Sequence, residues 1–163
     1  IHYFLYLLII QKIYYKANNM NTIASFLTAD HRACDEEFAN LENAVALDNW
    51  EESQVKLNKF IADLLHHFDM EEKVMFPTFE EVTGMTQGPT MIMRMEHDQM
   101  RQLLNALQED LEKKDRNHFF GVSESLMMLM QQHNMKEEQM LYAMADMRLG
   151  SFVEKVIEDM KAL

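Results

Sequence analysis

The sequence predicts an all-α protein, an up-down-up-down four-helix bundle with a short C-terminal helix. Composition is the first observation: the 163 residues include four Gly, two Pro and 16 Met, and 48% are hydrophobic. This mixture favours helix over strand and is enough for one core. Apolar residues also recur at intervals of three and four along four long segments. Two short turns and one longer central loop connect these segments, which is the pattern that such a bundle requires.

The charge balance and the single cysteine exclude several classes of protein. The chain has 27 acidic and 15 basic residues and a net charge of −12, which repels phosphate backbones and anionic lipid surfaces. We therefore expect no nucleic-acid partner and no membrane association of the domain itself. Cys34 alone cannot form an internal disulfide or a Cys-based zinc site, which fits a cytoplasmic location. Any metal must be held by His and carboxylate side chains.

Residues 1–19 differ from the rest of the chain because they contain no acidic residue. The apolar run over 3–10 is too short to span a bilayer, which needs roughly 20 residues, and it lacks the features of a signal peptide. We predict that Met20 is the native start, that residues 1–19 are an upstream extension outside the native domain, and that 20–163 form the bundle. The alternatives are the end of a truncated membrane anchor and a helix that packs on the domain.

The first half of the bundle is expected to be one helical hairpin. Apolar periodicity predicts a helix over about 21–47. Asn49, with Glu52 three residues later, has the form of a capping box that opens the second helix. This helix should continue until Pro77 forces a kink or a stop.

The second half repeats this arrangement after the longest loop, which Gly84, Gly88 and Pro89 mark. Gly150 should end the last long helix, since glycine is the commonest residue just beyond a helix end. The predicted segments are a third helix over 90–113, a turn over 114–117, a fourth helix over 118–148 and an amphipathic C-terminal helix over 151–161.

Four of the seven histidines form an internal repeat with a period of 66 residues, one copy for each hairpin. Within a copy the two histidines are 36 residues apart, and the second is followed at i+4 by a glutamate. Antiparallel packing brings the two histidines of a hairpin opposite each other, and His and Glu at i and i+4 lie on one helix face, ~6 Å apart. That spacing suits a pair of metal ions bridged by carboxylates. The candidate metal site is His31, His67, Glu71, His97, His133 and Glu137.

These motifs make residues 20–147 resemble the hemerythrin-like family, also called HHE cation-binding domains. The segments that carry the resemblance are Asp30-His31-Arg32, His67-x-x-x-Glu71-Glu72 leading to Phe76-Pro77, Met95-Glu96-His97 with Arg101, and His133-x-x-x-Glu137-Glu138 leading to Leu141-Tyr142. The resemblance implies a non-haem di-iron site inside the bundle, with an oxo or hydroxo group between two Fe ions that Mn or Zn could replace. The four histidines would be terminal ligands, and Glu71 and Glu137 would bridge.

The chain departs from the oxygen-carrying members of this family in two ways. Those proteins have a fifth His one turn along the third helix from the first. In this chain the positions one turn either side of His97 are Met93 and Arg101. Those proteins also place the second bridging carboxylate at i+5, which is Glu138 here, whereas the repeat favours Glu137. Four His, two bridging carboxylates and one bridging oxygen leave two of the twelve positions of two six-coordinate irons open. A more open site favours reactive chemistry or sensing over simple carriage.

Other residues have simpler interpretations. His66 is an alternative to His67, but only His67 fits the repeat. Tyr142 is interpreted as a packing residue, although related di-iron sites can place a tyrosine near the metal, and Cys34 as a small core residue with a redox thiol as the alternative. Glu72, Glu138, Asp30 and Glu96 are expected to orient the histidine rings. Core filling is predicted for the methionines at 91, 93, 95, 127, 128 and 130, with a soft lining around an oxidising centre as the alternative.

Three hypotheses of function follow. The first is a di-iron protein that binds or senses O₂, NO or a related small oxidant, for which signalling would require a protein partner. The second is an enzyme that decomposes peroxide or nitric oxide. The third is an iron-handling protein in the repair of oxidative or nitrosative damage. The sequence leaves open whether the protein is an enzyme, and it does not indicate an oligomeric state.

Overall fold

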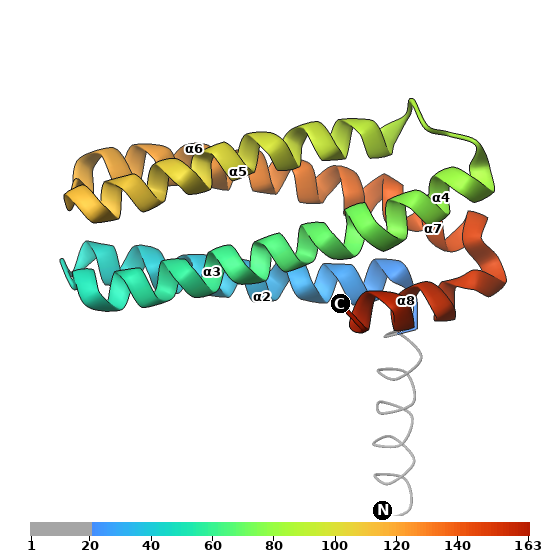
Figure 1. The fold of residues 1–163 in the computed structure, drawn as a ribbon, viewed down its shortest axis with the longest axis horizontal. Coiled ribbons are helices and arrows are strands. Elements are labelled where there is room, and N and C mark those ends of the chain that lie inside the picture. Colours follow the sequence, from blue (N-terminus) through green and yellow to red (C-terminus); the bar gives the residue numbers. More distant parts are fainter. Residues whose placement is uncertain (1–20) are drawn as a thin grey trace, which may run out of the picture.

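The computed structural model describes residues 21–163, so the expectations for residues 1–19 and for Met20 lie outside the described residues. All elements of the described part are helical, and Figure 1 shows their arrangement. In chain order they are α2 (Ile23–Ala46), α3 (Trp50–Met70), the π-helical turn η1 (Glu71–Met75), α4 (Phe76–Thr83), α5 (Pro89–Lys113), α6 (Arg116–Lys136), the π-helical turn η2 (Glu137–Leu141), α7 (Tyr142–Leu149), the 3₁₀ turn η3 (Gly150–Phe152) and α8 (Val153–Lys161).

These helices form four long rods in two antiparallel hairpins. The first hairpin pairs α2 with the rod α3–η1–α4, and the second pairs α5 with the rod α6–η2–α7 (Figure 1). The short helix α8 lies against the start of α2 at the end of the bundle that α4 and α7 form. The predicted all-α four-helix bundle with a short C-terminal helix is confirmed.

Local signals set the ends of the helices close to their predicted positions. The Asn49 side chain accepts a hydrogen bond from the Glu52 backbone N–H, so Asn49 caps α3 as predicted. Glu52 accepts from the Asn49 side-chain amide, not from the backbone N–H, so the second half of the predicted capping box is not formed. Asp115 caps α6 in the same way through the His118 N–H. Gly84 ends α4 with a φ of 72°, a left-handed conformation that glycine adopts without strain.

The second rod of the bundle does not stop at Pro77 but continues to Thr83. Pro77 is the second residue of α4, directly after η1, so the rod continues past a residue that has no backbone N–H. A π-helical turn also precedes α7, although Ala143 occupies the position equivalent to Pro77. Proline is therefore not the cause of these turns. They begin at Glu71 and Glu137, and such turns often occur at functional sites.

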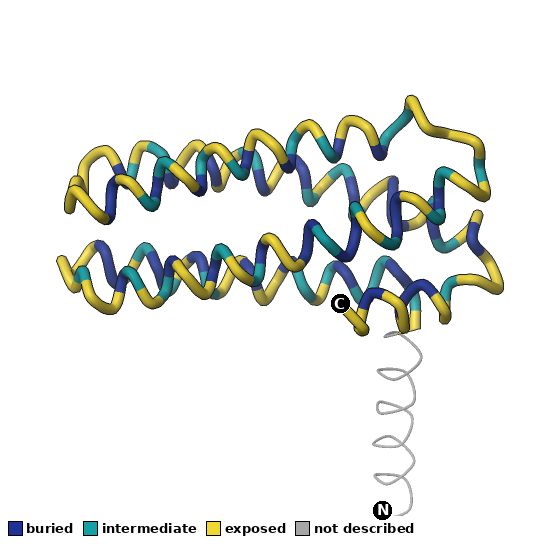
Figure 2. The backbone as a smooth tube through the Cα atoms, in the orientation of Figure 1, coloured by how far each residue is buried: buried dark blue, intermediate teal, exposed yellow. Residues whose placement is uncertain are grey.

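Two apolar clusters fill the bundle, with a polar layer between them. One cluster lies in the half with the α2–α3 and α5–α6 turns and includes Phe38, Phe60 and Leu107. The other includes Phe79 and Ile157 and lies under α4, α7 and α8. Figure 2 shows the buried positions facing inward along all four rods. The repeat histidines fall at the level where the two clusters meet.

The prediction that the methionines fill the core is wrong for four of the six. Met93 and Met130 are buried, but the other four lie on outward faces of α5 and α6 with exposed fractions between 37% and 57%. Buried and exposed residues alternate with the helical period, so a run of closely spaced methionines cannot all face inward. The exposed four are Met91, Met95, Met127 and Met128.

Asp146 of α7 ties the start of α2 to the opposite hairpin. Its carboxylate accepts hydrogen bonds from the Ile23 N–H at 2.7 Å and the Ala24 N–H at 3.1 Å. We expect Asp146→Ala to lower the free energy of unfolding by about 1–2 kcal/mol, because two helix N–H groups lose their acceptor. Urea denaturation measures the loss. Asp159→Ala, at an exposed position of α8, is the control and should cost less than about 0.5 kcal/mol. Equal losses would contradict this role for Asp146.

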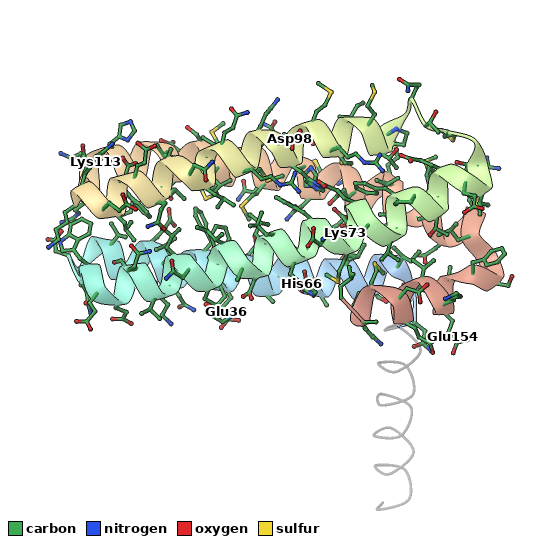
Figure 3. All side chains as sticks on the ribbon, viewed as in Figure 1. Glu36, His66, Lys73, Asp98, Lys113 and Glu154 are labelled. Carbon is green, nitrogen blue, oxygen red and sulfur yellow. The ribbon has the colours of Figure 1, made fainter. Side chains whose placement is uncertain are left out.

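Within residues 21–163, no helix is both long enough and apolar enough to cross a membrane. Charged side chains such as those of Glu36, Asp98 and Glu154 project from the outer surface of the bundle (Figure 3). These acidic side chains are therefore solvated.

Candidate metal centre

The four histidines of the repeat meet in the polar layer and are almost completely buried. His31 of α2 and His67 of α3 bring their Nε2 atoms within 3.0 Å of each other. His97 of α5 and His133 of α6 do the same at 3.1 Å. All four side chains are at most 3% exposed. Each hairpin therefore contributes one pair of imidazoles whose Nε2 atoms point at a common centre.

Four carboxylates fix the orientation of these rings through Nδ1. His31 donates to Glu138 at 2.9 Å and His97 to Glu72 at 2.7 Å, two equivalent contacts that cross between the hairpins. The other two contacts, His67 with Asp30 at 2.8 Å and His133 with Glu96 at 2.9 Å, stay within a hairpin. The prediction that these four acidic residues orient the rings is confirmed.

This arrangement determines which nitrogen of each ring carries the hydrogen. A carboxylate only accepts hydrogen bonds, so Nδ1 is protonated and Nε2 of the neutral ring presents a lone pair to the centre. Two lone pairs that face each other at 3.0–3.1 Å repel unless a cation lies between them. Imidazoles oriented by carboxylates in this way are typical of metal sites.

Basic side chains near the surface form ion pairs with three of the four orienting carboxylates. Arg32 binds Glu138 at 2.8 Å, Arg101 binds Glu72 at 2.9 and 3.0 Å, and Lys136 binds Glu96. Burial would raise the pKa of Glu72, but His97 and Arg101 outweigh it and lower that pKa. The same opposition between burial and its cationic partners lowers the pKa of Glu96. Glu72 and Glu96 therefore remain ionised and able to accept from the imidazoles.

Glu71 and Glu137 complete the centre as two fully buried carboxylates. Glu71 Oε2 lies 3.2 Å from His97 Nε2 and 3.7 Å from His67 Nε2. Glu137 reaches both histidine pairs, with Oε1 3.2 Å from His133 Nε2 and Oε2 3.3 Å from His31 Nε2. Glu71 Oε2 and Glu137 Oε1 are buried without a hydrogen-bond partner, which is costly for a carboxylate oxygen unless a cation compensates it.

The spacing of the donor atoms suits octahedral metal ions. Metal bonds of ~2.1 Å place neighbouring ligand atoms of an octahedral ion ~3 Å apart. The Nε2 and carboxylate contacts above lie at 3.0–3.3 Å, except for 3.7 Å between His67 and Glu71. The donor atoms form two groups, each with all members within 4.8 Å of one another. One group is Glu71, His97, His133 and Glu137, and the other is His31, His67 and Glu137.

Tyr142, interpreted from the sequence as a packing residue, places its hydroxyl in the centre. The oxygen lies 2.7 Å from Glu71 Oε1, 2.9 Å from Glu137 Oε2 and 3.1 Å from His31 Nε2. A phenol has one hydrogen to donate, whereas all three neighbours are acceptors when Nδ1 of His31 carries its hydrogen. The crowding of acceptors around this oxygen indicates that it too faces a cation.

The repeat contains a signal for Tyr142 that could have been found in the sequence. Phe76 is the equivalent residue of the first half, and its ring stacks on His97 at 5.9 Å as Tyr142 stacks on His31 at 5.7 Å. Only the second half has a hydroxyl at this place. A single pair of residues therefore makes the two ends of a symmetric centre chemically different.

The charges in the centre favour a cation. Burial would lower the pKa of His97, but Glu71 and Glu72 outweigh it and raise that pKa to about 9. Burial would raise the pKa of Glu137, but His133 and His31 hold it well below its usual value. Burial and the two carboxylates raise the pKa of Tyr142. Without a metal ion the carboxylates thus hold a proton on His97, and a bound cation would displace this proton and satisfy the same carboxylates while His97 becomes neutral.

The residues outside the centre also match most expectations. His66 is exposed on the outer face of α3 (Figure 3), unlike its neighbour His67, which is buried in the centre. Cys34 packs in the apolar core, where burial raises the pKa of its thiol to about 12. The thiol therefore stays protonated and unreactive at neutral pH. Arg101 and Met93 occupy the positions flanking His97, where Arg101 binds Glu72 and Met93 is buried in the apolar cluster.

Comparison with known proteins agrees with this geometry. The sequence model of the hemerythrin HHE cation-binding domain matches residues 22–145. A protein of Schizosaccharomyces pombe described as an uncharacterized hemerythrin-like protein is 30% identical over 122 residues, which are 74% of this chain. The matched region spans 57% of that relative's length. No solved structure matches the chain.

Proposed function

The chain belongs to the hemerythrin family of HHE cation-binding domains, and from that premise we propose that it is a non-haem di-iron protein that binds or senses O₂, NO or a related small oxidant. The observation that carries the proposal is the convergence of four imidazole Nε2 atoms and two buried carboxylates on one centre. A site of imidazole and carboxylate donors that leaves coordination positions open is typical of iron, whereas a structural zinc site is closed.

The residues divide into two sets around this centre. His97 and His133 would hold one iron and His31 and His67 the other, with Glu71 and Glu137 bridging. Glu137 suits a bridge because its two oxygens face different histidine pairs. Glu138, the alternative at i+5, is occupied by His31 Nδ1 and Arg32, which supports the assignment of the bridge to Glu137.

Tyr142 would supply a further oxygen on the His31 side. It would take one of the two positions that the other six side chains leave open, whereas its equivalent Phe76 offers no donor on the His97 side. We expect Tyr142→Phe to keep its iron but to lose the visible absorption band of a phenolate bound to ferric iron. Tyr142 is the only tyrosine of residues 21–163, so the band has one source in the described part. A band that survives in the variant would contradict this role.

The chain's own residues prepare the centre for a small ligand. When bound, the iron pair would supply electrons and an open coordination position to an oxidant. The orienting carboxylates keep every Nε2 directed inward, and the two apolar clusters exclude bulk water from the centre. Stacking of Phe68 and Phe76 on His97 makes the surroundings of the His97 side apolar, which suits a small uncharged ligand.

An enzyme that decomposes peroxide or nitric oxide is the second candidate. The observation that favours it is the replacement of a fifth histidine by Met93 and Arg101, because Arg101 is engaged with Glu72 and cannot close the open position. Handling of iron in stress repair has no structural feature in its favour within residues 21–163.

Three exposures of the reduced, iron-loaded protein test the proposal. The protein is exposed to O₂ and then to vacuum, to NO, or to peroxide, and its optical spectrum is recorded after each exposure. Spectral changes that reverse under vacuum, or a stable NO adduct, would support binding or sensing. Oxygen evolution from peroxide, or NO consumption, that disappears in Glu71→Ala would favour the enzyme. Iron-loaded protein that responds to none of the three would contradict both.

A further inference from the structure

The seam between α3 and α5 contains a hollow that the proposed iron ligands do not use. Its volume is about 280 Å³, and its lining consists of Ile61, Leu65, Arg101, Leu104 and Asn105. Leu65 is 36% exposed, so the hollow opens at the surface. A water-sized molecule occupies ~30 Å³, so a diatomic molecule fits easily. Three of the five lining side chains are apolar, which suits an uncharged gas better than an ion.

Phe68 connects this hollow to the metal centre. The Arg101 guanidinium, part of the lining, lies over the Phe68 ring at 5.2 Å from its centroid. The same ring stacks on His97 with centroids 3.9 Å apart and an interplanar angle of 17°. Phe68 itself is fully buried. One aromatic ring therefore contacts both the wall of the hollow and an imidazole of the centre.

The internal repeat provides a comparison that separates function from packing. The equivalent seam between α2 and α6 has a hollow of about 240 Å³ in the same place. Because the fold of the two seams is the same, differences between them are not required by the bundle. The equivalents of Ile61, Leu65, Phe68, Arg101, Leu104 and Asn105 are Met127, Gln131, Asn134, Asp35, Phe38 and Ala39.

These differences make the two sides chemically distinct. The α2–α6 side presents an amide and a carboxylate, Gln131 and Asp35, where the α3–α5 side has Leu65 and Arg101. In place of the Phe68 ring it has Asn134, which lines a further polar hollow with Arg32 and Glu138. Each hollow has three apolar side chains at its five equivalent positions, but only the α3–α5 side has an apolar residue, Leu65, opposite Gln131 of the other side, together with an aromatic ring against a histidine of the centre.

We propose that a small uncharged ligand such as NO or O₂ reaches the His97 side of the centre through the α3–α5 hollow, with the Phe68 ring as the gate. This inference rests on the proposed function. Arg101 is fixed by its two contacts with Glu72, which in turn holds His97. The ring of Phe68 is therefore the part that moves aside, while the imidazole and its support stay in place.

Two tryptophan variants at equivalent positions test the route. Leu65→Trp fills the mouth of the α3–α5 hollow, and Gln131→Trp fills the α2–α6 hollow as the matched control. The probe is NO, mixed with the reduced, iron-loaded full chain in a stopped-flow spectrometer. We expect Leu65→Trp to lower the association and dissociation rates of NO by about tenfold each, as an added barrier does, and to leave the Kd unchanged. Gln131→Trp should change neither rate.

Several results would overturn the route. These are unchanged rates in Leu65→Trp, an equal slowing in Gln131→Trp, or a changed Kd, which would indicate a disturbed centre instead of a blocked path. Leu65→Phe is the smaller substitution and serves if the tryptophan variant folds poorly. Iron-loaded protein that responds to neither NO, O₂ nor peroxide would instead overturn the proposed function, and the route with it, so the two failures are distinguishable.

Discussion

We expect the Glu137→Ala variant to retain less than half of the iron that the unchanged chain binds. Glu137 is the residue whose two carboxylate oxygens face different histidine pairs, at 3.2 and 3.3 Å. Its removal takes one donor from each proposed iron and leaves the centre with one carboxylate for four imidazoles. Iron per chain, measured by elemental analysis after loading and desalting, gives the result.

Glu138→Ala is the matched control for this change, since it removes the next carboxylate along the same helical turn. Glu138 orients His31 without facing the centre, so its loss should weaken iron binding by about 10–100-fold without abolishing it. If instead Glu138→Ala loses the iron and Glu137→Ala keeps it, the bridge lies at i+5 and the assignment from the repeat is wrong.

Removal of iron should destabilise the bundle strongly. A ligand that binds only the folded chain at 1,000 times its Kd adds about 4 kcal/mol to the free energy of unfolding. For a chain of this size each kcal/mol moves the Tm by roughly 2–4 °C, so we expect the iron-free protein to melt roughly 8–16 °C lower. The physical reason is that two buried carboxylates and four converging imidazoles lose the cations that offset their burial. Calorimetry of the loaded and chelated protein measures the difference.

The Glu137→Ala variant supplies the control for this stability difference. Its Tm should respond little to added iron, because the donor set that couples binding to folding is incomplete. Equal Tm values for the loaded and chelated forms of the unchanged chain would show that the buried centre is stable without a cation, and iron binding would then not be coupled to folding.

Much of the fold and of the candidate centre could be predicted from the sequence because the repeat carries the information twice. A His at one position and a His-x-x-x-Glu on the next helix are weak signals alone, but two copies in register identify His31, His67 and Glu71 with their counterparts His97, His133 and Glu137. The acidic residues that orient the rings could be predicted too, since they adjoin the histidines and glutamates in the chain.

Two features could not be predicted, and a third, Tyr142, was interpreted wrongly as a packing residue, each for a physical reason. The π-helical turns at Glu71 and Glu137 depend on the backbone's response to the centre, and only one of them is followed by proline. Tyr142 lies five residues beyond Glu137, a spacing that an α-helix does not place on the same face, and the π-helical turn between them brings its hydroxyl to 2.9 Å from that carboxylate. The outward methionines follow from the exact rotation of α5 and α6, which composition does not specify.

The most direct test of the central claim is the iron content of the purified chain together with its visible spectrum. We predict two iron atoms per chain after reductive loading, and a ferric spectrum after exposure to air that is lost when His97 and His133 are both replaced by alanine. A folded chain that binds no iron, or that keeps the same iron content and spectrum without these two imidazoles, would contradict a di-iron centre built from the four buried histidines.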